Sequence, residues 1–348
     1  MYRLISRAAT AVTLVTALAL GLGACSSGDD SSPTSSDVPV DGVSVDLVDP
    51  GEGPTEPLVW FSDSAEQKST FRATQGWEQH TEGGQDATPD GSTTDSPGSD
   101  HGDSGGGDGD GDGGSTAATT TDAGSGTDPA DAADIPYDEV TMAVPLTASA
   151  STDGENLKST VTAGVPTGSN TDLNDDIATA EGFVMSQQYG QDGRISSRSY
   201  TAPEKTTGTA RANIEPSFTQ MTDIPLVFPT DPVGTGATWT VTGQVDDNGT
   251  AMQQKVTYTL TTRDGSHVEL KIGIERTPTV RHLQGTDLDI LSSSSDSGGA
   301  LSLDLRRPLP VSGAVDTATT VTYGQPDSPV RVVQTYRSKS VWEPVSDN

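Results

Sequence analysis

The chain has 348 residues, with 19 Lys and Arg against 50 Asp and Glu, which gives a formal net charge of −31. This charge argues against nucleic-acid binding, because few side chains are available to neutralise phosphates. A single cysteine excludes an internal disulfide and every zinc or iron–sulfur site that is built from several cysteines.

The N-terminal residues have the layout of an export signal. Two arginines precede residues 8–21, a 14-residue stretch of apolar or small side chains that is shorter than the ~20 residues of a membrane-spanning helix. The stretch leads into Leu22-Gly23-Ala24-Cys25, which resembles the lipobox of bacterial lipoproteins. This resemblance implies that residues 1–24 are a cleaved lipoprotein signal peptide and that the Cys25 thiol carries a fatty acid such as palmitate. An ordinary secretory signal with a chance cysteine and a short membrane helix are the alternatives.

An acylated Cys25 would place the protein at the extracytoplasmic face of the cell membrane. The membrane is then its first expected partner, contacted through the lipid anchor. Residues 25–42 are rich in Ser, Asp, Gly and Pro, a composition typical of a flexible tether.

A second low-complexity segment, residues 81–134, is predicted to be a disordered insertion. Its 54 residues include 12 Asp, one Glu and 14 Gly, with no Lys or Arg, so it has little apolar surface to bury. Asp108-Gly109-Asp110-Gly111-Asp112-Gly113 matches the opening of an EF-hand calcium loop, but Thr119 stands where that loop requires a Glu. We therefore expect weak Ca²⁺ association at most and no folded metal site.

On both sides of this insertion, apolar side chains alternate with polar ones at period two. This pattern predicts strands with one buried and one exposed face, as in antiparallel sheets. Asx-Gly pairs between neighbouring runs predict tight hairpins: Asp153-Gly154, Asp192-Gly193, Asn248-Gly249 and Asp264-Gly265. The expected strand regions are 58–61, 68–79, 137–145, 157–165, 183–189, 194–200, 239–245, 256–260, 268–274, 301–305, 321–323 and 330–336.

The predicted fold is mainly β: an antiparallel, hairpin-rich sheet, half-barrel or sandwich-like, with at most one short helix. That helix is expected over Glu204–Gln220, although Gly208 and Pro216 weaken it. Residues 43–80 and 135–345 would form one β-rich domain, because loop-closure entropy tolerates a long surface insertion at small cost.

The sharpest local motif runs from Ile224 to Trp239. Three prolines make its first part extended, two glycines allow a sharp entry into the next strand, and Trp239 is the expected core anchor. Pro229, Val233, Gly234, Gly236 and Trp239 resemble the P-x-x-V-G-x-G-x-x-W segment of a β-rich family of Gram-positive envelope proteins that are often lipoproteins. The resemblance covers residues 56–80 and 135–345 and implies architecture and location, since no activity is assigned to that family. The Asp- and Thr-rich, Lys-poor composition resembles that of actinobacterial proteins.

No motif for catalysis emerges, so we expect no catalytic residue, no cofactor and no bound metal. Of the four histidines, His101 lies in the acidic insertion, His80 lies at its edge, and His267 should point to water. Asp287 and Asp289 have the spacing of a carboxylate pair for glycoside chemistry, but a water-facing strand explains them as well. The C-terminal arginines are expected to pair with nearby acids: Arg276, Arg281, Arg306, Arg307, Arg331 and Arg337.

Three functions stay open at this point. The leading hypothesis is a membrane-anchored, non-enzymatic lipoprotein that binds or scaffolds another envelope component, whether protein, glycan or lipid. The alternative is a carrier that holds a lipid or another small hydrophobic molecule in a curved sheet, which requires an apolar cavity. An envelope hydrolase is the third.

Overall fold

The computed structural model describes residues 34–40, 42–83, 134–247, 249–282, 288–325 and 327–345. The predicted signal peptide, Cys25 and the first part of the tether lie outside these residues. So do the EF-hand-like hexapeptide and most of the acidic insertion. None of the described helices is long and apolar enough to cross a membrane.

The described elements are mostly strands. Their bounds in chain order are β1 (Thr34–Val38), β2 (Ser44–Asp49), β3 (Glu52–Glu56), β4 (Gln67–Glu82), β5 (Ile135–Asp153), β6 (Asn156–Ala163), β7 (Thr167–Gly168), η2 (Thr171–Leu173), α1 (Asn174–Ile177), η3 (Ala178–Ala180), β8 (Val184–Gly190), β9 (Ile195–Ala202), α2 (Gly208–Thr222), β10 (Val233–Thr235), β11 (Thr238–Asp247), β12 (Thr250–Asp264), β13 (His267–Pro278), β14 (Asp289–Ser295), β15 (Gly298–Asp304), β16 (Ser312–Gly324) and β17 (Arg331–Pro344).

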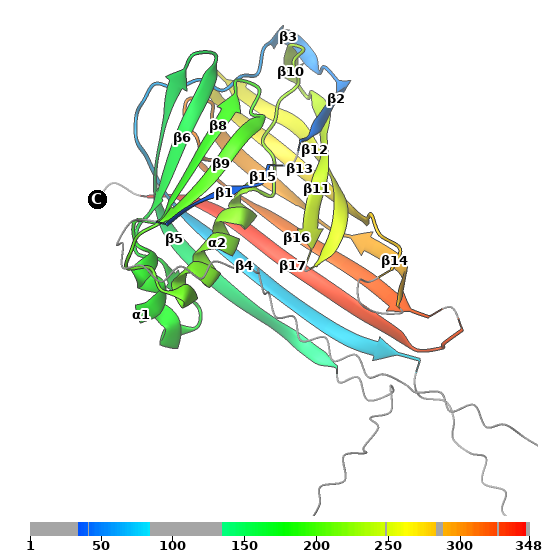
Figure 1. Ribbon diagram of the computed structural model, residues 1–348. Coiled ribbons are helices and arrows are strands. Elements are labelled where there is room, and N and C mark those ends of the chain that lie inside the picture. Colours follow the sequence, from blue (N-terminus) through cyan, green and yellow to red (C-terminus); the bar gives the residue numbers. More distant parts are fainter. Residues whose placement is uncertain are drawn as a thin grey trace, which may run out of the picture.

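Within the described residues, one antiparallel sheet of 15 strands dominates the fold. Its order is β1-β9-β8-β6-β5-β4-β17-β16-β15-β13-β12-β11-β2, with β14 beside β16 and β7 beside β5, while β3 and β10 form a separate pair. The sheet is continuous and curls on itself, with α2 lying in the curl (Figure 1). The mainly β, antiparallel fold class is confirmed, in its half-barrel form.

The predicted hairpins are present at all four Asx-Gly positions. Gly154, Gly193, Gly249 and Gly265 each follow a strand and have φ between +59° and +91°, the region that glycine enters without steric cost. Period two also holds along the strands. In β13, Val268, Leu270, Ile272 and Ile274 are 1–4% exposed and the residues between them face outward.

Helix α2 begins four residues later than predicted and ends two residues later. The Thr207 hydroxyl caps it by accepting from the Ala210 amide at 3.1 Å, which satisfies one of the free N–H groups of the first turn. Pro216 removes one backbone hydrogen bond inside the helix, and packing compensates. Phe218 contacts Phe183, the residue before β8, and Tyr200 of β9, with ring centroids 5.3 and 6.1 Å apart.

The segment from Ile224 to Trp239 folds as its prolines and glycines predict. Trp239 is fully buried, and its Nε1 donates to the Val227 carbonyl at 2.9 Å, so the extended segment is fixed against the strand that follows it. Phe228 completes the contact, with its ring centroid 6.2 Å from that of Trp239. The prediction of Trp239 as a core anchor is confirmed.

Four details differ from the sequence expectations. Thr34–Val38, inside the expected tether, forms β1 on β9, because an edge strand needs only backbone pairing. Residues 58–61 are not a strand, although Leu58 and Trp60 are buried. A second helical stretch spans 171–180 (η2, α1 and η3), so there is more than one short helix. The acidic insertion begins later than residue 81, because β4 continues to Glu82 in register with β17.

Candidate functional site

The two edges of the curled sheet are formed by strands that follow each other in the chain. β1 pairs with β9 at one edge and β2 pairs with β11 at the other. The chain between them, of which residues 39, 40, 42 and 43 are described, therefore crosses the open side of the half-barrel. We call residues 34–40 and 42–49 the strap.

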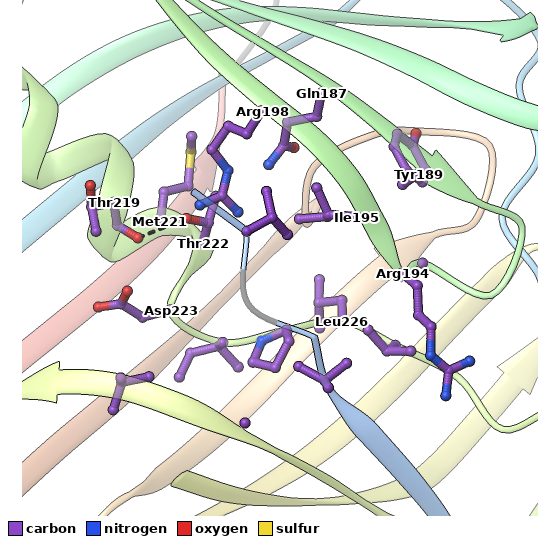
Figure 2. A pocket seen from close by; sticks show the side chains of 18 of the residues that line it. Gln187, Tyr189, Arg194, Ile195, Arg198, Thr219, Met221, Thr222, Asp223 and Leu226 are labelled. Atoms are coloured by element: carbon purple, nitrogen blue, oxygen red, sulfur yellow. Dashed lines mark hydrogen bonds between the residues drawn. The ribbon is translucent and has the colours of Figure 1, made fainter. Parts of the chain in front are cut away.

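Beneath the strap lies a cavity of about 420 Å³. Its walls come from β8 and β9 on one side and β11 on the other, and its floor from the end of α2 and the residues that follow it (Figure 2). Most of the lining is apolar: Val38, Pro39, Val40, Val43, Trp60, Met185, Tyr189, Ile195, Met221, Ile224, Pro225, Leu226, Val227, Val245, Leu301, Pro308, Leu309, Pro310 and Trp342.

Several of these apolar side chains are only partly buried although they point inward. Val38, Val43, Ile195 and Leu226 contact the edge of the main core without being enclosed by it. Inward apolar side chains on a filled sheet are normally closely packed. The cavity is therefore a place where the two walls of the half-barrel do not meet.

The end of the cavity nearest the β8–β9 turn is closed by contacts between segments distant in the chain. The Trp60 amide donates to the Gln191 carbonyl at 2.8 Å, and the Phe228 amide donates to the Asp192 carbonyl at the same distance. Gly193 is required there, because its φ is +91° and an added Cβ would lie 2.2 Å from the Leu226 carbonyl oxygen. This turn is therefore held to two segments outside the strands, one at Trp60 and one at Phe228.

Arg198 of β9 is the principal charged side chain in the cavity wall. It is directly opposite Gln187 of β8, and with its amide oxygen turned toward the guanidinium Gln187 accepts from Nε at 2.9 Å and from Nη2 at 3.2 Å. A register shift at Tyr189 places Ile195 opposite that residue. This bulge lets Ile195 and Arg198, an odd number of residues apart, both line the cavity (Figure 2).

Asp223, the C-cap residue of α2, is a second charged side chain in the lining, which also includes Arg194 and Asp246. Burial raises the pKa of its carboxyl to about 6, although Arg276 and Arg198 both act to lower it. The residue as a whole is half-buried and lines the cavity. Burial also lowers the pKa of Arg198, with Tyr200 and Asp223 opposing that change.

Behind Asp223 a buried polar network crosses β11, β12 and β13. Gln254 donates to the Asp223 backbone carbonyl at 2.7 Å and accepts from Arg276 Nε at 3.0 Å. Arg276 Nη1 lies 3.2 Å from Asp247 Oδ2, and both side chains are at most 3% exposed. The network fixes the position of Asp223 and gives its carboxylate a nearby positive charge.

The predicted pairing of C-terminal arginines with acids holds at four positions. Besides Arg276, these are Arg306 with Asp304 at 2.7 Å, Arg307 with Asp63 at 2.8 Å and Arg337 with Glu78 at 3.5 Å. Arg331 instead donates to backbone carbonyls, including that of Val330 at 2.9 Å. No ion pair forms at Arg281 within the described residues.

The residues considered for catalysis do not converge. His80 lies 3.2 Å from Glu82 at the surface, His282 pairs with Asp289, and the side chain of His267 is 60% exposed and faces water as predicted. Asp287 and His101 lie outside the described residues. In the described part of the chain no histidine hydrogen-bonds a serine, and no three His, Cys, Asp or Glu side chains gather as metal ligands would.

Sequence reasoning missed Arg198, Gln187 and Asp223. Met185, Gln187 and Tyr189 alternate along β8, so Gln187 is a polar residue in an inward position, which was a readable signal. Arg198 had such a signal as well, because it lies two residues before the buried Tyr200 on β9. Only the inward position of Ile195 depends on the bulge, which the alternation does not encode. Comparisons with protein families, with curated proteins and with solved structures found no match.

Proposed function

We propose that this chain is an extracytoplasmic lipoprotein, anchored through Cys25, whose half-barrel binds a small amphipathic molecule with a hydrocarbon tail. The observation that carries the proposal is the apolar cavity between the two edges of the sheet. This narrows the hypothesis of a binding module to the lipid-carrier alternative, which required such a cavity.

The size and lining of the cavity favour a small-molecule ligand. Its volume of about 420 Å³ falls within the roughly 300–1,000 Å³ range of ligand pockets, and a few polar groups interrupt a mainly apolar wall. Each methylene that leaves water contributes about 0.8 kcal/mol. Burying a tail of about ten methylenes would contribute about 8 kcal/mol to the binding free energy. The ligand's lost translational, rotational and conformational freedom reduces this gain, so binding requires that much of the tail is enclosed.

The expected anchor lies close in sequence to the cavity. Eight residues lie between Cys25 and Thr34, the first residue of the strap, so the nine residue steps of an extended chain place them at most about 32 Å apart. A lipid anchor at Cys25 would therefore hold the strap and the cavity opening near the membrane surface, where amphipathic ligands are found.

Filling the cavity is the direct test of this function. Ile195→Trp should occupy the space beneath the strap and reduce binding of an environment-sensitive fluorescent fatty acid at least tenfold. Val140→Trp is the matched control, because Val140 is 59% exposed on β5 and does not line the cavity. Equal binding by both variants and the unaltered protein, with both variants folded by circular dichroism, would refute the proposed site.

The anchor has its own test. Cys25→Ala should move the protein from the membrane fraction to the soluble fraction while leaving fatty-acid binding unchanged, since the substitution lies outside the described domain. Mass spectrometry of the mature N-terminus should find an acylated cysteine in the unaltered protein. Retention of the Cys25→Ala variant on membranes would contradict the anchor without affecting the cavity.

A further inference from the structure

The charged groups that line the cavity suggest which head group its ligand carries. Arg198 is half-buried in a chain with a large excess of acidic residues, yet no carboxylate forms an ion pair with it among the described residues. Gln187 accepts from Nε and Nη2, which leaves Nη1 without an acceptor in the described part of the protein.

Arg194, which lies four residues before Arg198 and also lines the cavity, forms an ordinary ion pair. Its guanidinium pairs with Asp192, and a backbone hydrogen bond of 3.0 Å from its amide to the same carboxylate fixes the pair. The difference between these two arginines shows that an acid can be placed beside a cavity arginine in this hairpin. At Arg198 the protein supplies only a neutral amide.

Asp223, on the floor of the cavity, has the charge opposite to that of Arg198. It makes no ion pair with Arg198, and no side-chain hydrogen bond to its carboxylate is formed within the described residues; its backbone carbonyl is the group that Gln254 holds. Two opposite charges thus border one cavity without joining each other (Figure 2). A buried charge without a partner is costly, and a ligand that offers partners to both would remove that cost.

The position of Arg198 also fits a head group. β9 is the strand next to edge strand β1, and Val38 of the strap pairs with Arg198 across that edge. Arg198 is therefore one strand from the opening, while Ile195 and Leu226 extend the apolar lining away from it (Figure 2). A head group at Arg198 leaves the rest of the cavity for a tail.

We propose that Arg198 and Asp223 recognise the head group of an anionic, hydroxyl-bearing amphiphile, with its phosphate or carboxylate at the Arg198 guanidinium and a hydroxyl donating to Asp223. This rests on the proposed function, because the tail requires the cavity. The net charge of −31 does not oppose it, since exposed charges beyond a Debye length of about 8–10 Å are largely screened and the adjacent guanidinium dominates. Arginine suits an oxyanion because its planar fork donates two hydrogen bonds at once.

Three probes distinguish recognition of the head group, recognition of the tail and binding of a soluble phosphate. They are 1-palmitoyl-lysophosphatidylglycerol, 1-palmitoylglycerol and glycerol 3-phosphate, each used below its critical micelle concentration in titration calorimetry. The unaltered protein should bind the lysophospholipid about tenfold or more tightly than palmitoylglycerol, in line with one charge-assisted contact. Glycerol 3-phosphate should bind far more weakly than either.

Arg198→Gln should remove the preference for the lysophospholipid while palmitoylglycerol binds as before. Arg337→Gln is the control and should preserve the preference, because Arg337 lies on β17, pairs with Glu78 and does not line the cavity. Asp223→Asn should weaken both hydroxyl-bearing lipids several-fold.

Each contrary outcome identifies a different error. Equal affinity of the two lipids for the unaltered protein, or an unchanged preference in Arg198→Gln, overturns the head-group assignment and leaves the cavity intact as a tail site. Tight binding of glycerol 3-phosphate alone overturns the amphiphile and indicates a soluble phosphate ligand. Absence of binding by both lipids overturns the proposed function itself.

Discussion

Inward and outward side chains alternate along the strands of both walls of the half-barrel, but the inward side chains are buried to different extents in the two walls. On the wall formed by β11, β12 and β13, which we call the filled half, Trp239, Tyr258 and Leu260 are fully buried. On the wall formed by β8 and β9, the hollow half, Gln187, Ile195 and Arg198 are only partly buried and border the cavity.

The difference lies in what covers each wall. The segment that follows α2 lies on the filled half and is fixed there by side-chain hydrogen bonds: Trp239 donates to the Val227 carbonyl at 2.9 Å and Tyr258 donates to the Pro225 carbonyl at 2.7 Å. The hollow half is faced by the narrow strap instead. The period-two pattern of a strand thus determines which side chains point inward. The segment that covers the strand determines whether those side chains are packed against other side chains or border a cavity.

The largest expected effect is in the filled half. Trp239→Ala should lower the free energy of unfolding by about 3–5 kcal/mol, because it removes a fully buried aromatic ring and leaves the Val227 carbonyl without its donor. Urea denaturation followed by circular dichroism measures the change. A loss below about 1 kcal/mol would mean that this half is not the stabilising core.

A smaller effect should appear as a pH dependence of the unfolding free energy, caused by Asp223 at the cavity floor. The raised pKa of Asp223, about 6, means that the folded state binds this proton more tightly than the unfolded state does. Its contribution to stability is therefore present near pH 4 and is lost as the pH rises to 6, by at most about 3 kcal/mol.

Asp223→Asn isolates this contribution from those of the other acids. The difference in unfolding free energy between the variant and the unaltered protein should grow in the variant's favour between pH 4 and 6 and stay constant above 7. Denaturation curves across this range provide the measurement. A difference that does not change with pH would place the carboxyl in water and not at the cavity.

The smallest effect is expected in the hollow half. Ile195→Ala should cost under about 1 kcal/mol, because the side chain already borders a space and its removal creates no new enclosed void. Ile272→Ala in the filled half is the matched comparison and should cost about 2–5 kcal/mol, since Ile272 is 3% exposed. Equal costs at the two positions would remove the distinction between the halves.

Much of the fold was readable from the sequence, because hairpins are local. Period-two runs joined by Asx-Gly turns predicted the central strands, and Trp239 was recognised as a core anchor from its size and its glycine-rich approach. β1 was missed because its residues, Thr34–Val38, are mostly polar and show no run of alternating apolar side chains. The apolar run at residues 58–61 was wrongly predicted to be a strand. Apolar side chains are buried both in a loop that covers a sheet and in a strand of the sheet, and the sequence does not distinguish the two.

The candidate site was harder to predict because it depends on distances between walls. No local sequence pattern indicates that the side chains of β8 and β11 are too far apart to contact each other. Nor does one indicate that α2 ends where Asp223 borders the cavity between these strands. The inward position of Gln187 was available from its alternation with Met185 and Tyr189. That of Arg198 was available from its alternation with Tyr200, whereas that of Ile195 depends on a bulge, which the sequence pattern alone does not reveal.

The most direct test of the central claim is to locate a bound tail. Crystals of the protein with a monoacylglycerol whose chain ends in bromine should give an anomalous bromine peak beneath the strap, in contact with residues such as Met185 or Met221. A peak on the outer face of the sheet, or none in the cavity under conditions where the same lipid binds in solution, would contradict the account.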